Sequence, residues 1–220
     1  MIIKALIAAR SGSVRVKNKN IRPFAGSTLL EIKINQLKRL NIFDDIVVNS
    51  NDGEILSIAK KYGVSIICRD SYYASNTVSM SEVYKNMAEN MGECDAIAYI
   101  NCTNPLIKDQ TIINLVNFYK AHYNEFDSVN SAHHIKEFMF LDNKPINYDL
   151  QHQPRSQDLP DILALNFAVS VLSKEKMIAC KNVVGEKPFI YPIDEVEATD
   201  IDNQIDFDFA EFVYRQMHNK

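Results

Sequence analysis

The sequence predicts an α/β fold of three layers, in which helices cover both faces of a mostly parallel sheet. Short apolar runs alternate with amphipathic segments over about the first 130 residues, which is the pattern of repeated strand–helix–strand units. The runs are apolar almost without interruption, as expected of parallel strands that are buried on both faces. In such a sheet the crossovers are right-handed, and ligands bind at the carboxyl ends of the strands.

Five strands and four helices are expected in this first part of the chain. The strands are the apolar runs at residues 4–9, 46–50, Ser65–Arg69, Ala96–Asn101 and Ser128–Ala132. The helices are the amphipathic segments Thr28–Leu40, Glu54–Tyr62, Ser79–Met91 and Gln110–Tyr119. In the first helix, Leu30, Ile34 and Leu37 recur at spacings of three and four, as one buried face of a helix requires.

The pattern changes between His133 and Asp161, where Asn, Gln, Asp and Pro are frequent and helical periodicity is absent. This composition predicts a hairpin-like excursion from the sheet, either a lid or an arm that reaches a second subunit. Regular structure returns with strands at 166–172 and 189–193 and an amphipathic helix from about Gln204 to Gln216. Because no repeat or linker divides the chain, we expect one domain over residues 1–220, with 133–161 as its excursion.

The first thirty residues contain no Asp or Glu but carry six basic side chains, whereas the remaining residues hold 18 basic and 28 acidic ones. Most of this positive charge lies in the loop AARSGSVRVKNKN (residues 8–20), directly after the first strand. Gly12 lets the backbone approach a phosphate, Arg10 can bridge two phosphate oxygens, and Lys19 adds a compact charge. The loop therefore predicts a polyphosphate site, although a solvated basic loop without a ligand has the same composition.

The chain from Pro188 to Tyr214 has the opposite character, with eight acidic side chains and no Lys or Arg. Asp200 and Asp202 are two residues apart, so in an extended segment they point to the same side. Paired carboxylates offer the hard oxygen ligands that Mg²⁺ prefers, and this predicts a metal site. The alternative is that these acids belong to an exposed strand end and a helix N-terminus, where Asp is common as a cap.

Composition also excludes several classes of protein. A net charge of −4, with the basic residues concentrated in one loop, argues against a nucleic-acid-binding protein. No apolar run approaches the 18 residues or so of a membrane span, so no membrane association is expected. Cys68, Cys94, Cys102 and Cys180 form no CxxC pair, which excludes a zinc ribbon and a redox motif and is typical of the reducing cytoplasm.

The run AARSGSVRVKNKNIRPFAGSTLLE (residues 8–31) resembles the opening signature of the acylneuraminate cytidylyltransferase family, also called CMP-sialic acid synthetases. Four later segments resemble further motifs of that family: ICRDSYYASNT (67–77), INCTNPL (100–106), HQPRSQDLP (152–160) and ATDIDNQIDFDFAE (198–211). The resemblance spans nearly the whole chain and is strongest at its two ends.

The resemblance implies a Rossmann-like nucleotidyltransferase fold and a homodimer that uses the excursion. It implies a Mg²⁺- or Mn²⁺-dependent transfer of CMP from CTP to the anomeric hydroxyl of a nine-carbon, sialic-acid-like α-keto acid sugar, with release of pyrophosphate. Two alternatives remain open: a cytidylyltransferase for an eight-carbon, 3-deoxy-octulosonate-type acid, or a catalytically inactive relative that binds CTP or a CMP-sugar.

The resemblance also implies roles for individual residues. The nucleotide and its phosphates would contact Arg10, Ser13, Arg15, Lys19 and Asn20, and the cytosine would contact Arg69 and the backbone near Val78. The metal would bind Asp200 and Asp202, with Asp206 as support. The acceptor sugar would contact Asn101, Arg155 and Asn166, and for Asn101 a role in the Pro-containing turn is the alternative. Arg10, Lys19 and Asp202 are the expected catalytic residues.

Two departures from the family pattern lie in the nucleotide half, and the others cluster on the side of the sugar. Val14 and Asn76 stand where the family has Lys and Asp. Asn101, Cys102, Asn104 and Ile107 replace the family's Gln, Pro, Ser and Arg, and Ala164–Ala168 replaces its R-P-N-G-A segment. The nucleotide half is therefore close to the family pattern and the sugar half is altered. This predicts a related acceptor, such as a legionaminic- or pseudaminic-type acid.

Overall fold

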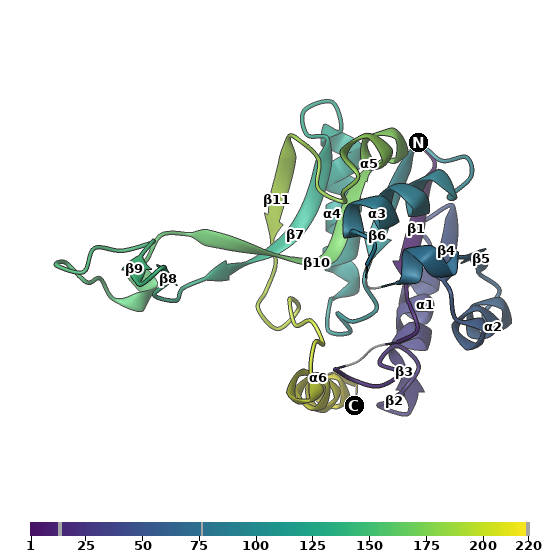
Figure 1. Cartoon of the computed structure of the whole chain (residues 1–220), viewed down its shortest axis with the longest axis horizontal. Helices are drawn as coiled ribbons and strands as arrows, with labels where there is room; N and C mark the ends of the chain where they lie inside the picture. Colours follow the sequence, from purple (N-terminus) through teal and green to yellow (C-terminus); the bar gives the residue numbers. More distant parts are fainter. Residues whose placement is uncertain (13–14, 76, 219–220) are drawn as a thin grey trace.

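The computed structural model describes residues 1–12, 15–75 and 77–218, and it confirms the α/β architecture. The described residues form a seven-stranded sheet in the order β11-β7-β10-β6-β1-β4-β5 (Figure 1). Its strands are β1 (Ile3–Ala8), β4 (Asp45–Ser50), β5 (Ser65–Cys68), β6 (Ala96–Ile100), β7 (Ser128–Ile135), β10 (Ile162–Ser173) and β11 (Pro188–Pro192). β10 is antiparallel to both of its neighbours, β6 and β7, and the remaining pairings are parallel.

Helices cover both faces of this sheet, so the predicted three layers are present. The helices are α1 (Leu29–Leu40), α2 (Gly53–Lys61), α3 (Met80–Glu89), α4 (Asp109–His122), α5 (Lys174–Cys180) and α6 (Gln204–His218). α1, α2, α4 and α6 pack on the face to which β1 presents Ile3, Ala5 and Ile7. α3 and α5 pack on the other face, to which β1 presents Leu6. The alternation follows from the period of two along a strand.

The expected strands and helices of the first 130 residues occur within a few residues of their predicted bounds. α1 begins after Thr28, which is its N-cap and accepts a hydrogen bond from the amide of Glu31 through Oγ1 (3.2 Å). Several short elements of the described chain were not expected, among them α5 and the two-residue strands β2 (Pro23–Phe24) and β3 (Ser27–Thr28). Such short elements produce no hydrophobic periodicity that a sequence can reveal.

One expectation about the connections is wrong. α1 and α4 pack on the same face of the sheet, but β1–α1–β4 and β6–α4–β7 move across it in opposite directions. The two crossovers therefore have opposite hands, so the crossovers cannot all be right-handed. β10 separates β6 from β7, and α4 packs beside α1. Because of this packing, α4 and the loop before it lie on the same face of the sheet as α1.

An arm projects from the body between β7 and β10 (Figure 1). The excursion was expected to begin at His133. The strands β7 and β10 instead stay paired as far as Ile135 and Ile162, with His134 opposite Leu163. Beyond these paired residues the arm contains a small hairpin of β8 (Phe140–Leu141) and β9 (Lys144–Pro145). Antiparallel pairing, which composition alone did not reveal, therefore organises the base of the arm.

The parallel strands bring several loops to one edge of the sheet. The chain leaves β1, β5, β6, β7 and β11 at their carboxyl ends, and these ends lie on the same edge because the strands run in the same direction. Residues 162–168 of the antiparallel β10 extend past the end of β6 at this edge, since Val169 is opposite Ile100. Across the described ranges, no helix combines the length and the apolar character needed to span a bilayer.

Candidate active site

The basic loop that follows β1 is fixed to the end of β4. The amide of Ala9 donates to the backbone carbonyl of Asn49 (3.1 Å), and Ser11 exchanges two hydrogen bonds with the side chain of Asn51. Gly12 has a φ of 78°, in the left-handed region that glycine adopts without steric cost. The loop is therefore held at its start. Ser13, an expected nucleotide contact, lies outside the described residues.

The positive and negative ends of the chain meet at this loop. Arg15 Nη2 lies 2.7 Å from Asp202 Oδ1, and Lys19 Nζ lies 3.9 Å from the same oxygen. Lys19 Nζ also donates to the backbone carbonyl of Ile201. Contacts across more than 180 residues of sequence thus bring together the groups that the charge distribution singled out.

Capping of α6 does not account for Asp202. The carboxylate of Asp206 accepts hydrogen bonds from the amides of Asp202 (2.8 Å) and Asn203 (2.9 Å). Asn203 Oδ1 in turn accepts from the amides of Ile205 and Asp206, so Asn203 and Asp206 form a reciprocal cap. The Asp202 carboxylate points instead to Arg15 and Lys19, and its backbone is held in place by Asp206, as expected.

Asp200 is the more buried of the two candidate metal ligands. Burial raises the pKa of its carboxyl group, while a hydrogen bond from Thr103 and the charge of Lys19 act in the opposite direction. Its Oδ1 is buried and finds no hydrogen-bond partner among the described residues. A buried carboxylate oxygen without a partner is costly, and a cation bound there would compensate for it.

A magnesium ion fits this donor set. Within the described part of the chain, no group of three His, Cys, Asp or Glu side chains is arranged to hold a metal. Mg²⁺ does not require such a group, because it commonly binds one or two carboxylates and completes its shell with water and substrate phosphates. Asp200 and Asp202 have two such carboxylates, and the cations Arg15 and Lys19 lie beside Asp202.

Two hollows meet at Arg10. The first has a volume of about 260 Å³ and is lined by Ala8, Arg10, Arg15, Val16, Lys19, Asn20, Thr103 and Asp202. The second, also of about 260 Å³, is lined by Arg10, Arg69, Tyr73, Ser75, Val78, Met80 and Val83. The first contains the charged groups and the second is mostly apolar. A nucleoside triphosphate is divided in a similar way, since its charge lies on the triphosphate and its base is uncharged.

Arg69 lies in the second hollow, as expected for a residue that contacts the base. It is 6% exposed, and its Nε donates to Asn49 Oδ1 (2.5 Å). Burial lowers the pKa of Arg69, and the nearby charge of Arg10 lowers it further. A guanidinium stays charged in proteins, so Arg69 remains a donor. Val78, the other expected base contact, lines the same hollow.

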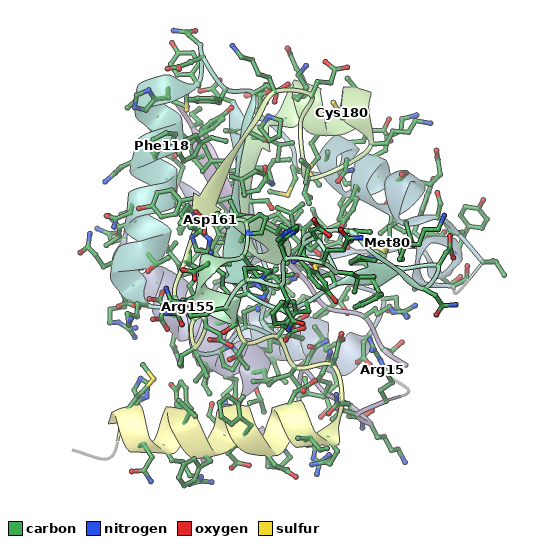
Figure 2. All side chains as sticks on the ribbon, turned by 90° about the vertical axis from the view of Figure 1, so that its left-hand side faces the viewer. Arg15, Met80, Phe118, Arg155, Asp161 and Cys180 are labelled. Carbon is green, nitrogen blue, oxygen red and sulfur yellow. The ribbon has the colours of Figure 1, made fainter. Side chains whose placement is uncertain are left out.

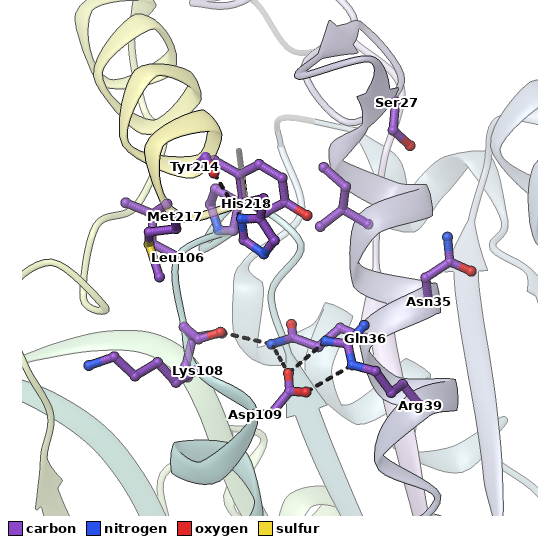
Figure 3. A pocket seen from close by; sticks show the side chains of 13 residues that line it. Ser27, Asn35, Gln36, Arg39, Leu106, Lys108, Asp109, Tyr214, Met217 and His218 are labelled. Atoms are coloured by element: carbon purple, nitrogen blue, oxygen red, sulfur yellow. Dashed lines mark hydrogen bonds and ion pairs between the residues drawn. The ribbon is translucent and has the colours of Figure 1, made fainter. Parts of the chain in front are cut away.

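A larger cavity lies elsewhere, between α1, residues 105–109 and the end of α6 (Figure 3). Its volume is about 470 Å³. Two of the cations that line it are paired with carboxylates, Arg39 with Asp109 and Lys108 with Glu197. Its charge is therefore balanced locally, whereas the smaller hollow at Lys19 gathers three cations around Asp202.

Two of the three expected sugar contacts are close together. The amide of Asn101 donates to the carbonyl of Ala168 (3.3 Å), and Asn166 Oδ1 accepts from the amide of Ala168 (3.1 Å). Asn166 Nδ2 is buried without a partner among the described residues. Between them Phe167 has a φ of 54°, a conformation that Gly adopts more readily. Phe167 stands where the family's R-P-N-G-A motif has Gly, and its backbone still adopts a conformation that glycine favours.

Arg155 is not near either hollow within one chain. It lies on the arm, which points toward the viewer in Figure 2, and its Nε pairs with Asp158 Oδ2 (2.7 Å). Asn20 is buried beside the first hollow, where its Oδ1 accepts from Cys102 Sγ (3.3 Å). Of the expected site residues that the structure describes, Asn101 and Asn166 also line neither hollow, and Arg155 alone lies on the arm.

Thr103 and Asn49 are site residues that sequence reasoning missed. Thr103 lines the hollow at Lys19, and its carbonyl accepts from the amide of Ile201 (3.0 Å). It belongs to the segment NCTNPL, which precedes α4 but does not cap it, since the N-cap of α4 is Lys108. Asn49, which holds Arg69, gave no signal because it lies within an ordinary buried strand, one residue before the end of β4.

Comparisons with known proteins give the chain relatives in sequence and in fold. Residues 4–159 match the family model described as Cytidylyltransferase. The chain is 26% identical to post-translational flagellin modification protein B of Campylobacter coli, over 97% of this chain and 95% of that protein. It is 28% identical to pseudaminic acid cytidylyltransferase of Campylobacter jejuni subsp. jejuni, over 97% and 96%. A structure of CMP:2-keto-3-deoxy-manno-octonic acid synthetase complexed with CTP shares the fold, with a TM-score of 0.73, 11% identity and coverage of 99% and 100%.

The charged hollow generates a prediction about CTP binding. Arg10→Ala and Lys19→Ala should each weaken CTP affinity by about 1.5–3 kcal/mol, roughly ten- to hundred-fold, because each removes a charge-assisted contact to phosphate. Calorimetric titration with CTP and Mg²⁺ measures this. Lys17→Ala, an exposed charge in the same loop, is the matched control and should change little. Unchanged affinity in both site variants would contradict the assignment.

Proposed function

Because this chain belongs to the cytidylyltransferase family, we propose that it transfers CMP from CTP to the anomeric hydroxyl of a nonulosonic acid and releases pyrophosphate. The observation that carries the proposal is the hollow at the end of β1, where Arg10, Arg15 and Lys19 gather beside Asp202. The relatives support a nine-carbon acceptor, since one of them is named for pseudaminic acid and matches over nearly its full length.

The chemistry of the reaction explains why the site is cationic. The anomeric oxygen attacks the α-phosphorus, and the bond between that phosphorus and the pyrophosphate oxygen breaks. Negative charge then increases on the phosphoryl oxygens and on the departing pyrophosphate. In the proposal Arg10, Arg15 and Lys19 bind these oxygens, because preorganised cations stabilise charge that develops in the transition state. Asn20 and Ser13 complete the set of nucleotide contacts.

Asp200 and Asp202 would hold the divalent ion, Mg²⁺ or Mn²⁺. Bound there, the ion would act as a Lewis acid that neutralises charge on the phosphates. Asp206 holds the backbone of Asp202 and so orients its carboxylate. Arg69 and the backbone at Val78 would contact the cytosine in the neighbouring hollow, which Arg10 joins to the phosphate site.

Recognition of the acceptor involves the altered half of the site and the arm. We assign Asn101 and Asn166 to the sugar, since both lie beside Ala168 at the end of β6. We further propose a homodimer, in which Arg155 on the arm of one protomer binds the acceptor's carboxylate in the site of the other. Exposed apolar side chains on the arm support this, among them Phe140 (53%), Leu141 (63%) and Leu150 (63%). Free cysteines support a cytoplasmic location.

A pyrophosphate-release assay tests the proposed reaction directly. With CTP and Mg²⁺, we expect turnover with a nonulosonic acid from a panel that includes sialic, legionaminic and pseudaminic acids. Preference for an eight-carbon 3-deoxy-octulosonate would assign the chain to that activity instead. CTP binding without turnover on any acid of the panel would indicate a binding protein that has lost catalysis.

Asp202→Asn should lower kcat by roughly a hundred-fold or more, the scale expected when one transition-state contact is lost. Part of the loss should be recovered at high Mg²⁺, because the substitution weakens metal binding rather than the fold. The matched control is Asp208→Asn, an acid of α6 whose carboxylate accepts from Gln204 Nε2. An Asp202→Asn protein that loses thermal stability but keeps full activity per folded molecule would refute the metal assignment.

Arg155→Ala should raise the KM for the sugar acid roughly ten-fold or more and leave the KM for CTP unchanged, since one charge-assisted contact is lost. Lys144→Ala, another exposed cation of the arm, is the control. Sedimentation velocity should give a dimer. A monomer with full activity would rule out a site shared between protomers.

A further inference from the structure

Lys33 of α1 is a charged side chain at an apolar position. It is 0% exposed and shares the buried face of the helix with Leu30, Ile34 and Leu37. Burial of an ammonium group costs several kcal/mol, and it lowers the pKa of Lys33 to about 7, against the attraction of Cys102 and Asp109. An apolar side chain of the same length would fill this position at lower cost. Any advantage of Lys33 at this position must therefore come from the hydrogen bonds that it makes.

Lys33 binds the loop that follows β6. Its Nζ donates to Gln36 Oε1 (2.7 Å) and to the backbone carbonyl of Asn104 (3.1 Å). Gln36 Nε2 in turn donates to the backbone carbonyl of Ile107 (2.8 Å). Two neighbouring side chains of one rigid helix thus hold residues 104 and 107 of the loop.

The hydrogen bonds between α1 and this loop continue to the start of α4. Gln36 Nε2 donates to Asp109 Oδ1 (3.0 Å), and Arg39 donates to both oxygens of Asp109 at 2.9 Å (Figure 3). Asp109 is the first residue of α4. The loop between β6 and α4 therefore cannot shift along α1 without breaking a connected set of hydrogen bonds.

The same loop holds the segment that carries the two candidate metal ligands. Asn104 Nδ2 donates to the backbone carbonyls of Thr199 (3.1 Å) and Ala198 (3.5 Å). The carbonyl of Thr103 accepts from the amide of Ile201 (3.0 Å). These bonds fix the backbone on both sides of Asp200 and directly before Asp202. A continuous chain of contacts therefore runs from Lys33 through Asn104 to the metal-binding segment.

We propose that Lys33 is a positioning residue for Asp200 and Asp202: its side-chain amino group holds the carbonyl of Asn104, and Asn104 in turn holds the carbonyls of Ala198 and Thr199, directly before Asp200. The inference rests on the proposed function, because it gives Lys33 a role in the metal site of that reaction. It also gives a role to a buried amino group at a position of the helix where an apolar side chain would cost less.

Two measurements on Lys33→Met test the proposal. Methionine keeps the length and removes the donor. Amide hydrogen exchange in residues 198–202 should become faster by about tenfold or more, because the segment loses its support. The Mg²⁺ concentration for half-maximal activity should rise about ten- to hundred-fold, the usual effect of removing support from a metal ligand. The KM for CTP at saturating Mg²⁺ should stay unchanged.

Lys38→Met is the matched control, since Lys38 lies on the exposed side of the same helix and donates to the carbonyl of Tyr62 (2.7 Å). Asn104→Ala breaks the chain of contacts at its other end and should give the same two changes. It tests the proposal independently if Lys33→Met does not fold. The double variant should be no worse than the more severe single one, because both act through one path.

Unchanged exchange in residues 198–202 and an unchanged Mg²⁺ requirement, with only the thermal midpoint altered, would overturn the proposal. Additive losses in the double variant would do the same. The exchange measurement does not require activity. If the protein proved unable to transfer CMP, the proposed function would fail, while the link from Lys33 through Asn104 to residues 198–202 would still be tested.

Discussion

The parallel strands β1, β5, β6, β7 and β11 all end at one edge of the sheet, and this constraint determines where the other features of the molecule lie. The basic loop follows β1, Arg69 follows β5, and the loop with Thr103 and Asn104 follows β6. The arm follows β7, and the acidic segment follows β11. Residues that are far apart in sequence are therefore gathered along one edge, where open α/β sheets bind their ligands.

The ion pair between Arg15 and Asp202 does not hold this edge together. Both side chains are substantially exposed, 67% and 49%, and exposed pairs contribute about 0–1 kcal/mol. Packing carries more weight: Phe207 of α6 is 2% exposed, and its ring meets that of Phe24 edge-on with centroids 5.3 Å apart. Burial of one such side chain contributes about 1.5–3 kcal/mol. The fold thus holds opposite charges in place, and they remain available to a charged ligand.

Sequence reasoning succeeded where a single segment contained the whole signal. Periodicity located α1 and the first strands, and the uneven charge singled out two segments that the fold brings together at Lys19 and Asp202. It could not recognise Lys33, which interrupts an apolar face and gains its meaning from Asn104, 71 residues away. Thr103 acquires its role from Ile201 in the same way. The hand of β6–α4–β7 was also beyond prediction, because it depends on the packing of α4 beside α1, and that packing lays the loop against Lys33.

A crystal structure with a non-hydrolysable CTP analogue and Mn²⁺ tests the central claim most directly, because anomalous scattering locates the metal independently of the nucleotide. The account predicts a manganese peak held by Asp200 and Asp202, with the triphosphate against Lys19 and Arg10 and the base in the hollow of Arg69. A metal bound by other side chains, or a triphosphate outside the hollow at the end of β1, would contradict it.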